Sequence, residues 1–131
     1  MPGMSYYQIR IHGLFESAHY LYDYYPDGSD EELHGHTWEA EVFINSSQLK
    51  NGISVDFLDV RKVFDELMLE LDHVCLNEVK PFDKENPTAE NLAAFIYERI
   101  KDAIPAPALA HEVRVWEGPK NHASYFPGGK A

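Results

Sequence analysis

Two histidines stand at the head of an alternating segment, and this segment constrains the fold more than any other part of the sequence. Successive side chains of a strand point to opposite faces of a sheet, so residues two apart share a face. One face of the segment carries His34, His36, Trp38, Ala40, Val42 and Ile44, and the other carries Thr37, Glu39 and Glu41. The pattern predicts a strand with one buried face and both histidines at the end of that face.

Further strands and helices follow from the same periodicities. Residues 5–15, 111–119 and 121–126 read as strands. Residues 54–73 have the helical period, with Asp56 as N-cap. The predicted buried stripe of this helix is Phe57, Val60, Phe64, Leu67 and Leu71. A second helix is predicted from Asn86 as N-cap and Pro87 as the first helical residue, up to the prolines near residue 105.

The order strand, strand, helix, helix, strand, strand favours an α+β fold. Helices grouped between pairs of strands predict an antiparallel sheet that is covered on one face. The length of 131 residues fits one domain, residues 1–131, large enough for a hydrophobic core.

Composition excludes several classes of protein. A net charge of −11, with 11 scattered basic residues, argues against a nucleic-acid partner, because phosphates need clustered cations. The sequence has no apolar run long enough for a membrane span, and its start, "MPGMSYYQIR", does not resemble a signal peptide. Its only cysteine, Cys75, excludes an internal disulfide. These features predict a cytoplasmic protein.

The histidines are candidate metal ligands. On a strand, the side chains of His34 and His36 point the same way and can reach one ion. Zinc needs a third protein ligand at a catalytic site, and His19 is the candidate because a neighbouring strand would place it beside His34. The alternative is a turn with two solvated imidazoles, the more common fate of an isolated pair. Placement on an apolar face favours metal, but spacing alone leaves both interpretations open.

Two other positions suggest chemistry. Asp72 and His73 stand at the predicted end of the first helix, where an aspartate can orient a histidine for proton transfer. Neighbouring residues within a helix do not face each other, so the pair can couple only if the helix has ended. Glu117 lies on the same strand face as Val113 and Val115, and a carboxylate there would need a ligand with N–H donors. The alternatives are a charged helix terminus and a turn residue.

Several short motifs, taken together, resemble the 6-pyruvoyltetrahydropterin synthase / 6-carboxytetrahydropterin synthase family. They are "LFESAH", "LHGHTWEAEVFI", "VDFLDV", "LDHVCLNE", "ENPTAENLA" and "VWEGPKNHASY", in the order of the family and over nearly the whole chain. The resemblance implies the tunnelling fold, a four-stranded antiparallel sheet with two helices packed on one face. It also implies a homo-oligomer, typically a hexamer built as a dimer of trimers, with active sites between subunits.

The resemblance further implies roles for individual residues. His19, His34 and His36 would bind Zn²⁺, which acts as a Lewis acid on the side-chain hydroxyls of a dihydropterin substrate. Glu117 would anchor the pterin ring. Thr88 and Glu90 belong to the segment that frames the ring, and Asp72 and His73 match the Asp-His relay of the family.

The sequence departs from the family at its catalytic cysteine. That cysteine commonly lies four residues before the first histidine of the HGH motif, and Asp30 stands there, followed by Glu31 and Glu32. Cys75 does not match the position, and we expect it to be a small buried hydrophobic residue. A carboxylate with a raised pKa can serve as the base, and mutual repulsion among the three acids would raise it. The alternative is a solvated acidic loop in an altered or inactive enzyme.

Three hypotheses about function remain. The first is a zinc-dependent lyase acting on dihydroneopterin triphosphate or dihydroneopterin. Its product would be 6-carboxytetrahydropterin, a precursor of 7-deazaguanine compounds such as queuosine, or a cleaved pterin. Some branches of the family use a glutamate near position 30 for such cleavage. The second is a zinc- and pterin-binding member without turnover. The third is an oligomer in which the histidines hold a metal only for structure.

Overall fold

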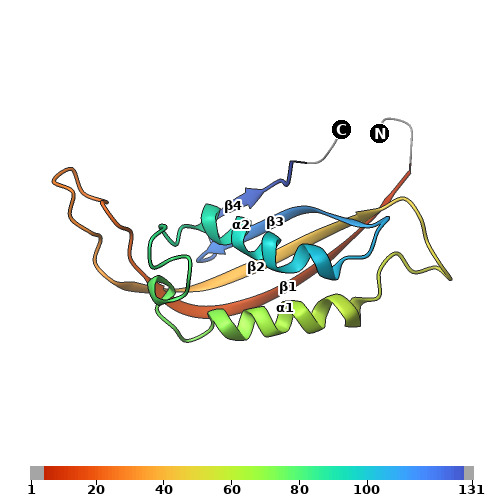
Figure 1. Ribbon diagram of the computed structural model, residues 1–131, viewed down its shortest axis with the longest axis horizontal. Helices are drawn as coiled ribbons and strands as arrows, with labels where there is room; N and C mark the ends of the chain where they lie inside the picture. Colours follow the sequence, from red (N-terminus) through yellow and green to blue (C-terminus); the bar gives the residue numbers. More distant parts are fainter. Residues whose placement is uncertain (1–4, 129–131) are drawn as a thin grey trace.

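The computed structural model describes residues 5–128 as a four-stranded antiparallel sheet with two helices (Figure 1). The strands lie in the order β1-β2-β3-β4. They comprise β1 (Tyr7–His19), β2 (His34–Ser46), β3 (Leu109–Glu117) and β4 (Asn121–Tyr125). The helices α1 (Phe57–Leu71) and α2 (Ala89–Ile100) lie between β2 and β3 in the chain, with short 3₁₀ helices at Leu76–Glu78 and Lys101–Ala103.

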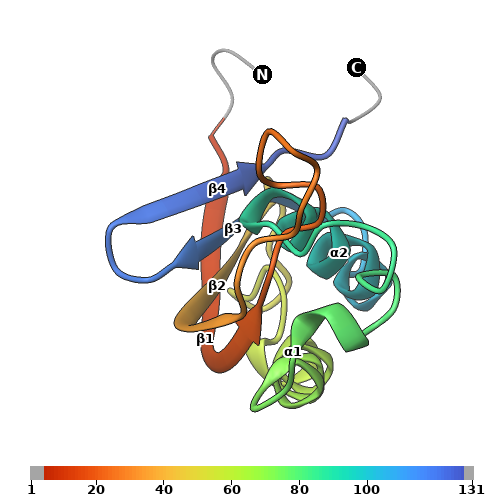
Figure 2. The same ribbon diagram turned by 90° about the vertical axis from the view of Figure 1, so that its left-hand side faces the viewer.

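Both helices cover the same face of the sheet (Figure 2). The apolar face of β2 meets them there, and Trp38, Val42 and Ile44 are almost fully buried. From the helices, Phe64 and Ile96 enter the same core. The predicted α+β architecture, with helices on one face of an antiparallel sheet, is therefore confirmed.

Helix ends match the predictions in one case and differ in another. Asp56 caps α1, and its carboxylate accepts a hydrogen bond from the backbone N–H of Leu58 at 3.0 Å. Phe57 does not join the buried stripe: it is the first residue of α1 and is 55% exposed. The predicted cap of α2 is also wrong. Thr88 is the N-cap, and its hydroxyl accepts from the N–H of Asn91.

Strand β1 is longer than the sequence pattern predicts and carries the first histidine. It continues four residues beyond Phe15, because antiparallel pairing with β2 is maintained up to the pair His19 and His34. Helix α1 approaches this strand closely at Gly13, where a Cβ atom would come within 2.8 Å of the Phe64 ring. The close approach explains a glycine within a strand.

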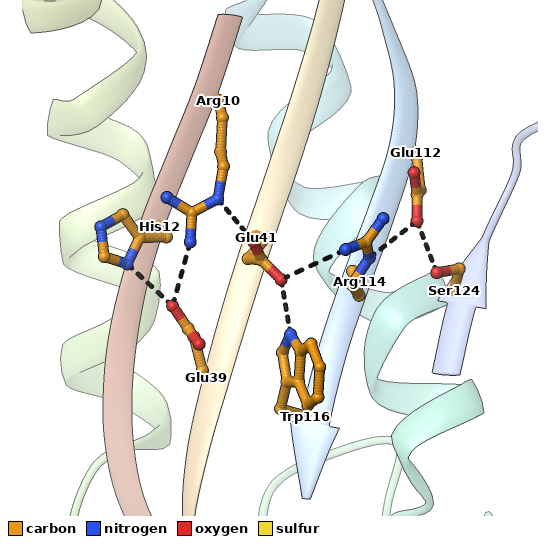
Figure 3. A network of polar contacts seen from close by, with 8 residues as sticks. All are labelled: Arg10, His12, Glu39, Glu41, Glu112, Arg114, Trp116 and Ser124. Atoms are coloured by element: carbon orange, nitrogen blue, oxygen red, sulfur yellow. Dashed lines mark hydrogen bonds and ion pairs between the residues drawn. The ribbon is translucent and has the colours of Figure 1, made fainter. Parts of the chain in front are cut away.

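The face of the sheet that no helix covers carries a polar network (Figure 3). At its centre Glu41, with a side chain only 6% exposed, accepts hydrogen bonds from Arg10 and Trp116. Burial disfavours the charged carboxylate, but these hydrogen bonds and the Arg10 charge outweigh burial and lower the pKa of Glu41. The network therefore holds a buried carboxylate in its ionised form.

None of the helices within residues 5–128 has the length and apolar character that a membrane crossing requires.

Candidate functional site

Three histidines meet at one end of the sheet. His19 is the last residue of β1 and pairs with His34, the first residue of β2, while His36 lies two residues further on the same face. One ring nitrogen from each lies within 4.8 Å of the others. The pairing of β1 with β2 therefore brings together the three predicted ligands, and the prediction that a neighbouring strand places His19 beside His34 is confirmed.

Hydrogen bonds orient two of the three rings. Nδ1 of His19 lies 2.7 Å from the carbonyl oxygen of Pro87, and Nδ1 of His34 lies 2.8 Å from that of Glu32. A carbonyl can only accept, so each Nδ1 carries the proton and each Nε2 presents a lone pair. In metal-binding histidines the second ring nitrogen usually donates to a carbonyl or a carboxylate in this way, which fixes the orientation of the ring.

The free nitrogens fit a cation. Nε2 of His19 and Nε2 of His36 are buried and have no hydrogen-bond partner among residues 5–128. Burial is also the main reason why the pKa of His19 lies below its usual value, which favours the neutral imidazole that binds metal. Two buried nitrogens without hydrogen-bond partners raise the free energy of the folded protein unless a ligand binds them. The donor set is therefore suited to a metal such as Zn²⁺.

Glu117, the last residue of β3, points toward this cluster. Its carboxylate oxygens lie 3.2 Å from Nε2 of His19 and 3.9 Å from Nε2 of His36. An oxygen with lone pairs facing a lone-pair nitrogen needs a cation or a proton between them. Glu117 thus adds negative charge beside the three histidines, and the predicted inward orientation of its side chain is confirmed.

A cavity of about 370 Å³ opens beside Glu117. Thr88 and Glu90 line it, together with His19 and His122. The structure therefore brings the three residues predicted to bind a pterin ring to one cavity next to the histidines. Thr88 is also the N-cap of α2.

The Asp72 and His73 side chains do couple. Helix α1 ends at Leu71, and His73 has a φ of 55°, which turns its ring back so that Nδ1 lies 2.8 Å from Asp72. The carboxylate of Asp72 also accepts the backbone N–H of Glu16. This N–H, and next the hydrogen bond from His73, lower the pKa of Asp72. The condition set from the sequence, that the helix must have ended, is met.

His73 and His36 line a second cavity of about 560 Å³. Cys75 lines it as well and is partly exposed, so the expectation that it is a buried hydrophobic residue is wrong. The reason is that the chain has left α1 at this point and runs beside β1, where Cys75 forms a bridge with Ala18.

The three acids before β2 have separate positions. The carboxylate of Asp30 accepts the N–H of Asp23 at 3.0 Å, and the carbonyl oxygen of Glu32 accepts from His34. Of these three acids, only Glu31 has its carboxylate within 4.0 Å of one of the three histidines: it lies 3.9 Å from Nδ1 of His34, on the side of the ring opposite Nε2, and is 20% exposed. Among the three candidate bases, Glu31 is therefore the one beside the cluster.

Some lining residues were not predicted from the sequence. Leu21, Asn121 and His122 share the cavity of Glu117. His122 packs on the Trp116 ring, with ring centroids 4.3 Å apart. His122 lies on β4 opposite Trp116, so its place at the cavity depends on the pairing of β3 with β4, which the sequence pattern alone does not give.

Comparison with known proteins gives consistent matches. The family described as "6-pyruvoyl tetrahydropterin synthase" matches residues 8–128. "Dihydroneopterin monophosphate aldolase" of Pyrococcus furiosus is 42% identical over 88 residues, 67% of this chain and 73% of that protein. "6-carboxy-5,6,7,8-tetrahydropterin synthase" of Synechocystis is 35% identical over 118 residues, 86% of this chain and 87% of that protein.

Solved structures share the fold. The 6-pyruvoyl tetrahydropterin synthase of Caenorhabditis elegans superposes with a TM-score of 0.80 at 23% identity, covering 98% of this chain and all of that one. The Plasmodium vivax 6-pyruvoyltetrahydropterin synthase, solved with alanine in place of a glutamate described as a catalytic residue, has a TM-score of 0.73 at 16% identity and covers 92% of this chain and 97% of that one. The fold, the three-histidine cluster and the family match over residues 8–128 lead to one conclusion: this chain belongs to the 6-pyruvoyl tetrahydropterin synthase family.

Proposed function

We propose that the protein is a zinc-dependent lyase that cleaves the side chain of a dihydroneopterin-type substrate, with Glu31 as the base. The observation that carries this proposal is that, of the three candidate acids, Glu31 has its carboxylate beside a cluster histidine, 3.9 Å from Nδ1 on the outer side of the His34 ring. A carboxylate can serve as a base when it is within reach of the proton that it removes. In the Plasmodium vivax protein a glutamate is likewise described as a catalytic residue.

His19, His34 and His36 would hold the zinc, since three neutral imidazoles leave one position open for substrate. Bound there, zinc supplies Lewis-acid chemistry that acidifies the side-chain hydroxyls of the substrate. The remaining steps belong to the side chains around the cluster.

The cleavage follows retro-aldol chemistry. Glu31 removes the proton of the hydroxyl on the second side-chain carbon, a carbonyl forms there, and the bond between the first and second carbons breaks. The electron pair of that bond enters the C6–N5 imine of the dihydropterin ring. His73, held by Asp72 at 2.8 Å and opening on the same cavity as His36, returns a proton to the first carbon. The products are a 6-hydroxymethyl dihydropterin and a two-carbon aldehyde.

Ring recognition is assigned to the cavity of about 370 Å³. Glu117 can accept two N–H bonds from the 2-amino and N3 groups of a pterin, while Thr88 and Glu90 lie at the same cavity wall. Because Glu117 lies 3.2 Å from Nε2 of His19, a ring bound to it would lie next to the metal position.

The charge around the site favours a substrate without phosphate. Residues 11–49 contain no lysine or arginine, and none lines either cavity among the described residues. The loop before His34 carries several carboxylates, including Asp27, Asp30 and Glu32. A triphosphate would meet repulsion there instead of the cations that phosphates require. Dihydroneopterin itself is therefore the preferred substrate in this proposal.

A second candidate is 6-carboxytetrahydropterin formation, because the Synechocystis enzyme of that name matches 86% of this chain. It requires the triphosphate of dihydroneopterin as substrate and therefore predicts the opposite preference. A third possibility, a family member that binds zinc and pterin without turnover, predicts tight binding and no product.

The proposal extends to assembly and location. Strands β1 and β4 are the two edges of the sheet and can pair with other copies, as the hexameric dimer of trimers implied by the family resemblance requires. A single cysteine suits the reducing cytoplasm.

Mass spectrometry of products tests the proposal. Zinc-loaded protein is incubated separately with dihydroneopterin and with its triphosphate. We expect a 6-hydroxymethyl dihydropterin from dihydroneopterin and little conversion of the triphosphate. A 6-carboxytetrahydropterin from the triphosphate would support the second candidate instead, and tight pterin binding without any product would support the third.

A further inference from the structure

The loop between β1 and β2, residues 20–33, projects beyond the end of the sheet (Figure 1). We call it the β1–β2 arm. Its outer part packs little, since Tyr24 and Tyr25 are both exposed. Glu31 lies on the return side of this arm, so something other than a hydrophobic core must fix the position of its carboxylate.

Asn77 holds the base of the arm with both ends of its side-chain amide. Its Oδ1 accepts the backbone N–H of Tyr20 at 3.0 Å, and its Nδ2 donates to the carbonyl oxygen of Tyr20 at 2.8 Å. The side chain comes from the short 3₁₀ helix after α1, and the residue is only 4% exposed. A buried amide that bonds both the N–H and the carbonyl group of one residue fixes the backbone at that residue.

Asn86 repeats this arrangement two residues further along. Its Oδ1 accepts the backbone N–H of Tyr22 at 2.5 Å, and its Nδ2 donates to the carbonyl oxygen of Tyr22 at 3.3 Å. The Tyr22 hydroxyl adds a bond to the carbonyl oxygen of Phe82. Asn86 lies two residues before Thr88, the N-cap of α2, and its side chain bonds the arm instead of the helix.

The two asparagines take the place of a neighbouring strand. Alternate residues of an extended chain present their N–H and C=O groups to the same side, and a strand partner normally satisfies them. Here two side-chain amides do so for Tyr20 and Tyr22. The outgoing side of the arm is thus fixed from one edge.

Glu31 is hydrogen-bonded to Leu21, the residue between Tyr20 and Tyr22, on the side of the chain opposite the two asparagines. Its backbone N–H donates to the carbonyl oxygen of Leu21 at 2.9 Å, and its Oε1 accepts the N–H of Leu21 at 3.2 Å. Asn77 and Asn86 therefore fix Tyr20 to Tyr22, and Leu21 in turn fixes both the backbone and the carboxylate of Glu31. The same carboxylate lies 3.9 Å from His34.

We propose that Asn77 and Asn86 are positioning residues that act through Leu21 to hold the Glu31 carboxylate beside the histidine cluster. This inference rests on the proposed function only in its catalytic part, because the hold on the arm can be measured without turnover. Displacement of a reacting group by about 1 Å can lower the rate about 100-fold. Loosening the arm should therefore lower kcat by about 10- to 100-fold without loss of the metal ligands.

The test uses the full chain, loaded with zinc, carrying Asn86→Ala. Asn77→Ala serves as a second variant, because Asn77 is buried and its loss can impair folding. Asn45→Ala is the control, since Asn45 bonds Gln8 at the far end of β2. Three quantities are measured: zinc content, hydrogen exchange at the backbone amides of Leu21, Tyr22 and Glu31, and kcat with KM.

We expect exchange at these amides to rise at least about tenfold in Asn86→Ala and to stay unchanged in Asn45→Ala. Zinc content should stay at the wild-type value, and kcat should fall with KM changed less than about threefold. In a Glu31→Gln background, Asn86→Ala should lower the residual kcat no further, because this background has no Glu31 carboxylate for Asn86 to position.

Three results would overturn the inference: unchanged exchange in both variants, unchanged kcat despite faster exchange, or an equal further loss of kcat in the Glu31→Gln background. If the wild-type protein shows no turnover on any pterin, the proposed function fails. The exchange data then decide alone whether the asparagines hold Glu31, with unchanged protection as the contrary result.

Discussion

His19 and His34 face each other as register partners across β1 and β2, with ring centroids 4.7 Å apart. The hydrogen bonds from their Nδ1 atoms go to Pro87 and Glu32, outside the two strands. The pairing of β1 with β2 therefore fixes the positions of the two histidine backbones. The hydrogen bonds to the flanking loops fix the orientation of the rings, and with it the direction of each Nε2 atom. A metal bound by these histidines would connect the end of the sheet to both loops.

Metal removal should accordingly destabilise the protein. We expect one zinc per chain, and a loss of about 4 kcal/mol in the free energy of unfolding when a chelator removes metal that is present at about 1,000 times its Kd. His19→Ala should abolish stoichiometric binding, whereas His12→Ala, on the uncovered face of the sheet, should retain it. Elemental analysis and thermal unfolding measure both. Full zinc content in His19→Ala would refute the assignment of this ligand.

Glu41 should make stability depend on acid. Its folded-state pKa lies below the ordinary value, so the unfolded chain binds more protons in the window between the two values. Its contribution is present above the unfolded pKa, near 4.3, and is lost as the pH falls through the folded pKa. Urea unfolding from pH 7 down to pH 3 should show this loss.

Glu41→Gln should cost about 1–2 kcal/mol near neutral pH, because it weakens the charge-assisted hydrogen bonds of Arg10 and Trp116, while Arg10 is 42% exposed and stays solvated. It should also flatten the acid dependence. Glu39→Gln is the matched control on the same face, where the side chain is 28% exposed and the expected cost is about 0–1 kcal/mol. Equal costs for the two substitutions would show that the network around Glu41 adds no stability.

Gly13→Ala should destabilise the contact between β1 and α1. The new Cβ would lie 2.8 Å from the Phe64 ring and 3.1 Å from Met68, so the helix must shift at a cost of about 1–3 kcal/mol. Gly35→Ala has open space around the added carbon and should leave the free energy of unfolding nearly unchanged. Chemical denaturation compares the two. A smaller loss for Gly13→Ala than for Gly35→Ala would contradict the close approach.

Asp72→Asn should impair catalysis more than stability. The amide keeps an oxygen for the N–H of Glu16 but no longer presents a carboxylate to His73. If the pair transfers the proton to substrate, kcat should fall about 100-fold or more. Asp65→Asn, which removes an exposed ion pair with Arg61 on α1, is the control. A kcat equal to that of the control would remove the Asp72 and His73 pair from the mechanism.

Periodicity was enough to predict the elements that build the fold and most of the residues that they bury, with Phe57 as an exception. The alternation after His34 gave the orientation of two ligands, and the end of α1 gave the coupling of Asp72 with His73. Local pattern was insufficient wherever a side chain has a distant partner. Asn86 has the sequence context of a helix cap, yet its amide bonds Tyr22, which is 64 positions away.

The choice among the three acids also depended on long-range contacts. Asp30, Glu31 and Glu32 are equivalent in sequence, but only the geometry of the β1–β2 arm directs one of them to His34. Cys75 was likewise predicted to be buried, and this prediction was wrong because the exposure of Cys75 depends on how the chain runs beside β1. The scaffold of the site was therefore predictable, and the choice of Glu31 as the proposed base was not.

The most direct test of the account is the kcat for aldehyde release from dihydroneopterin by zinc-loaded wild-type protein and by Glu31→Gln, each with its zinc content measured. We expect wild-type turnover, a fall of about 100- to 10,000-fold in Glu31→Gln at unchanged zinc content, and near wild-type values in Asp30→Asn and Glu32→Gln. Wild-type turnover that persists in Glu31→Gln would contradict the assignment of the base. No aldehyde from the wild-type protein would contradict the proposed cleavage itself.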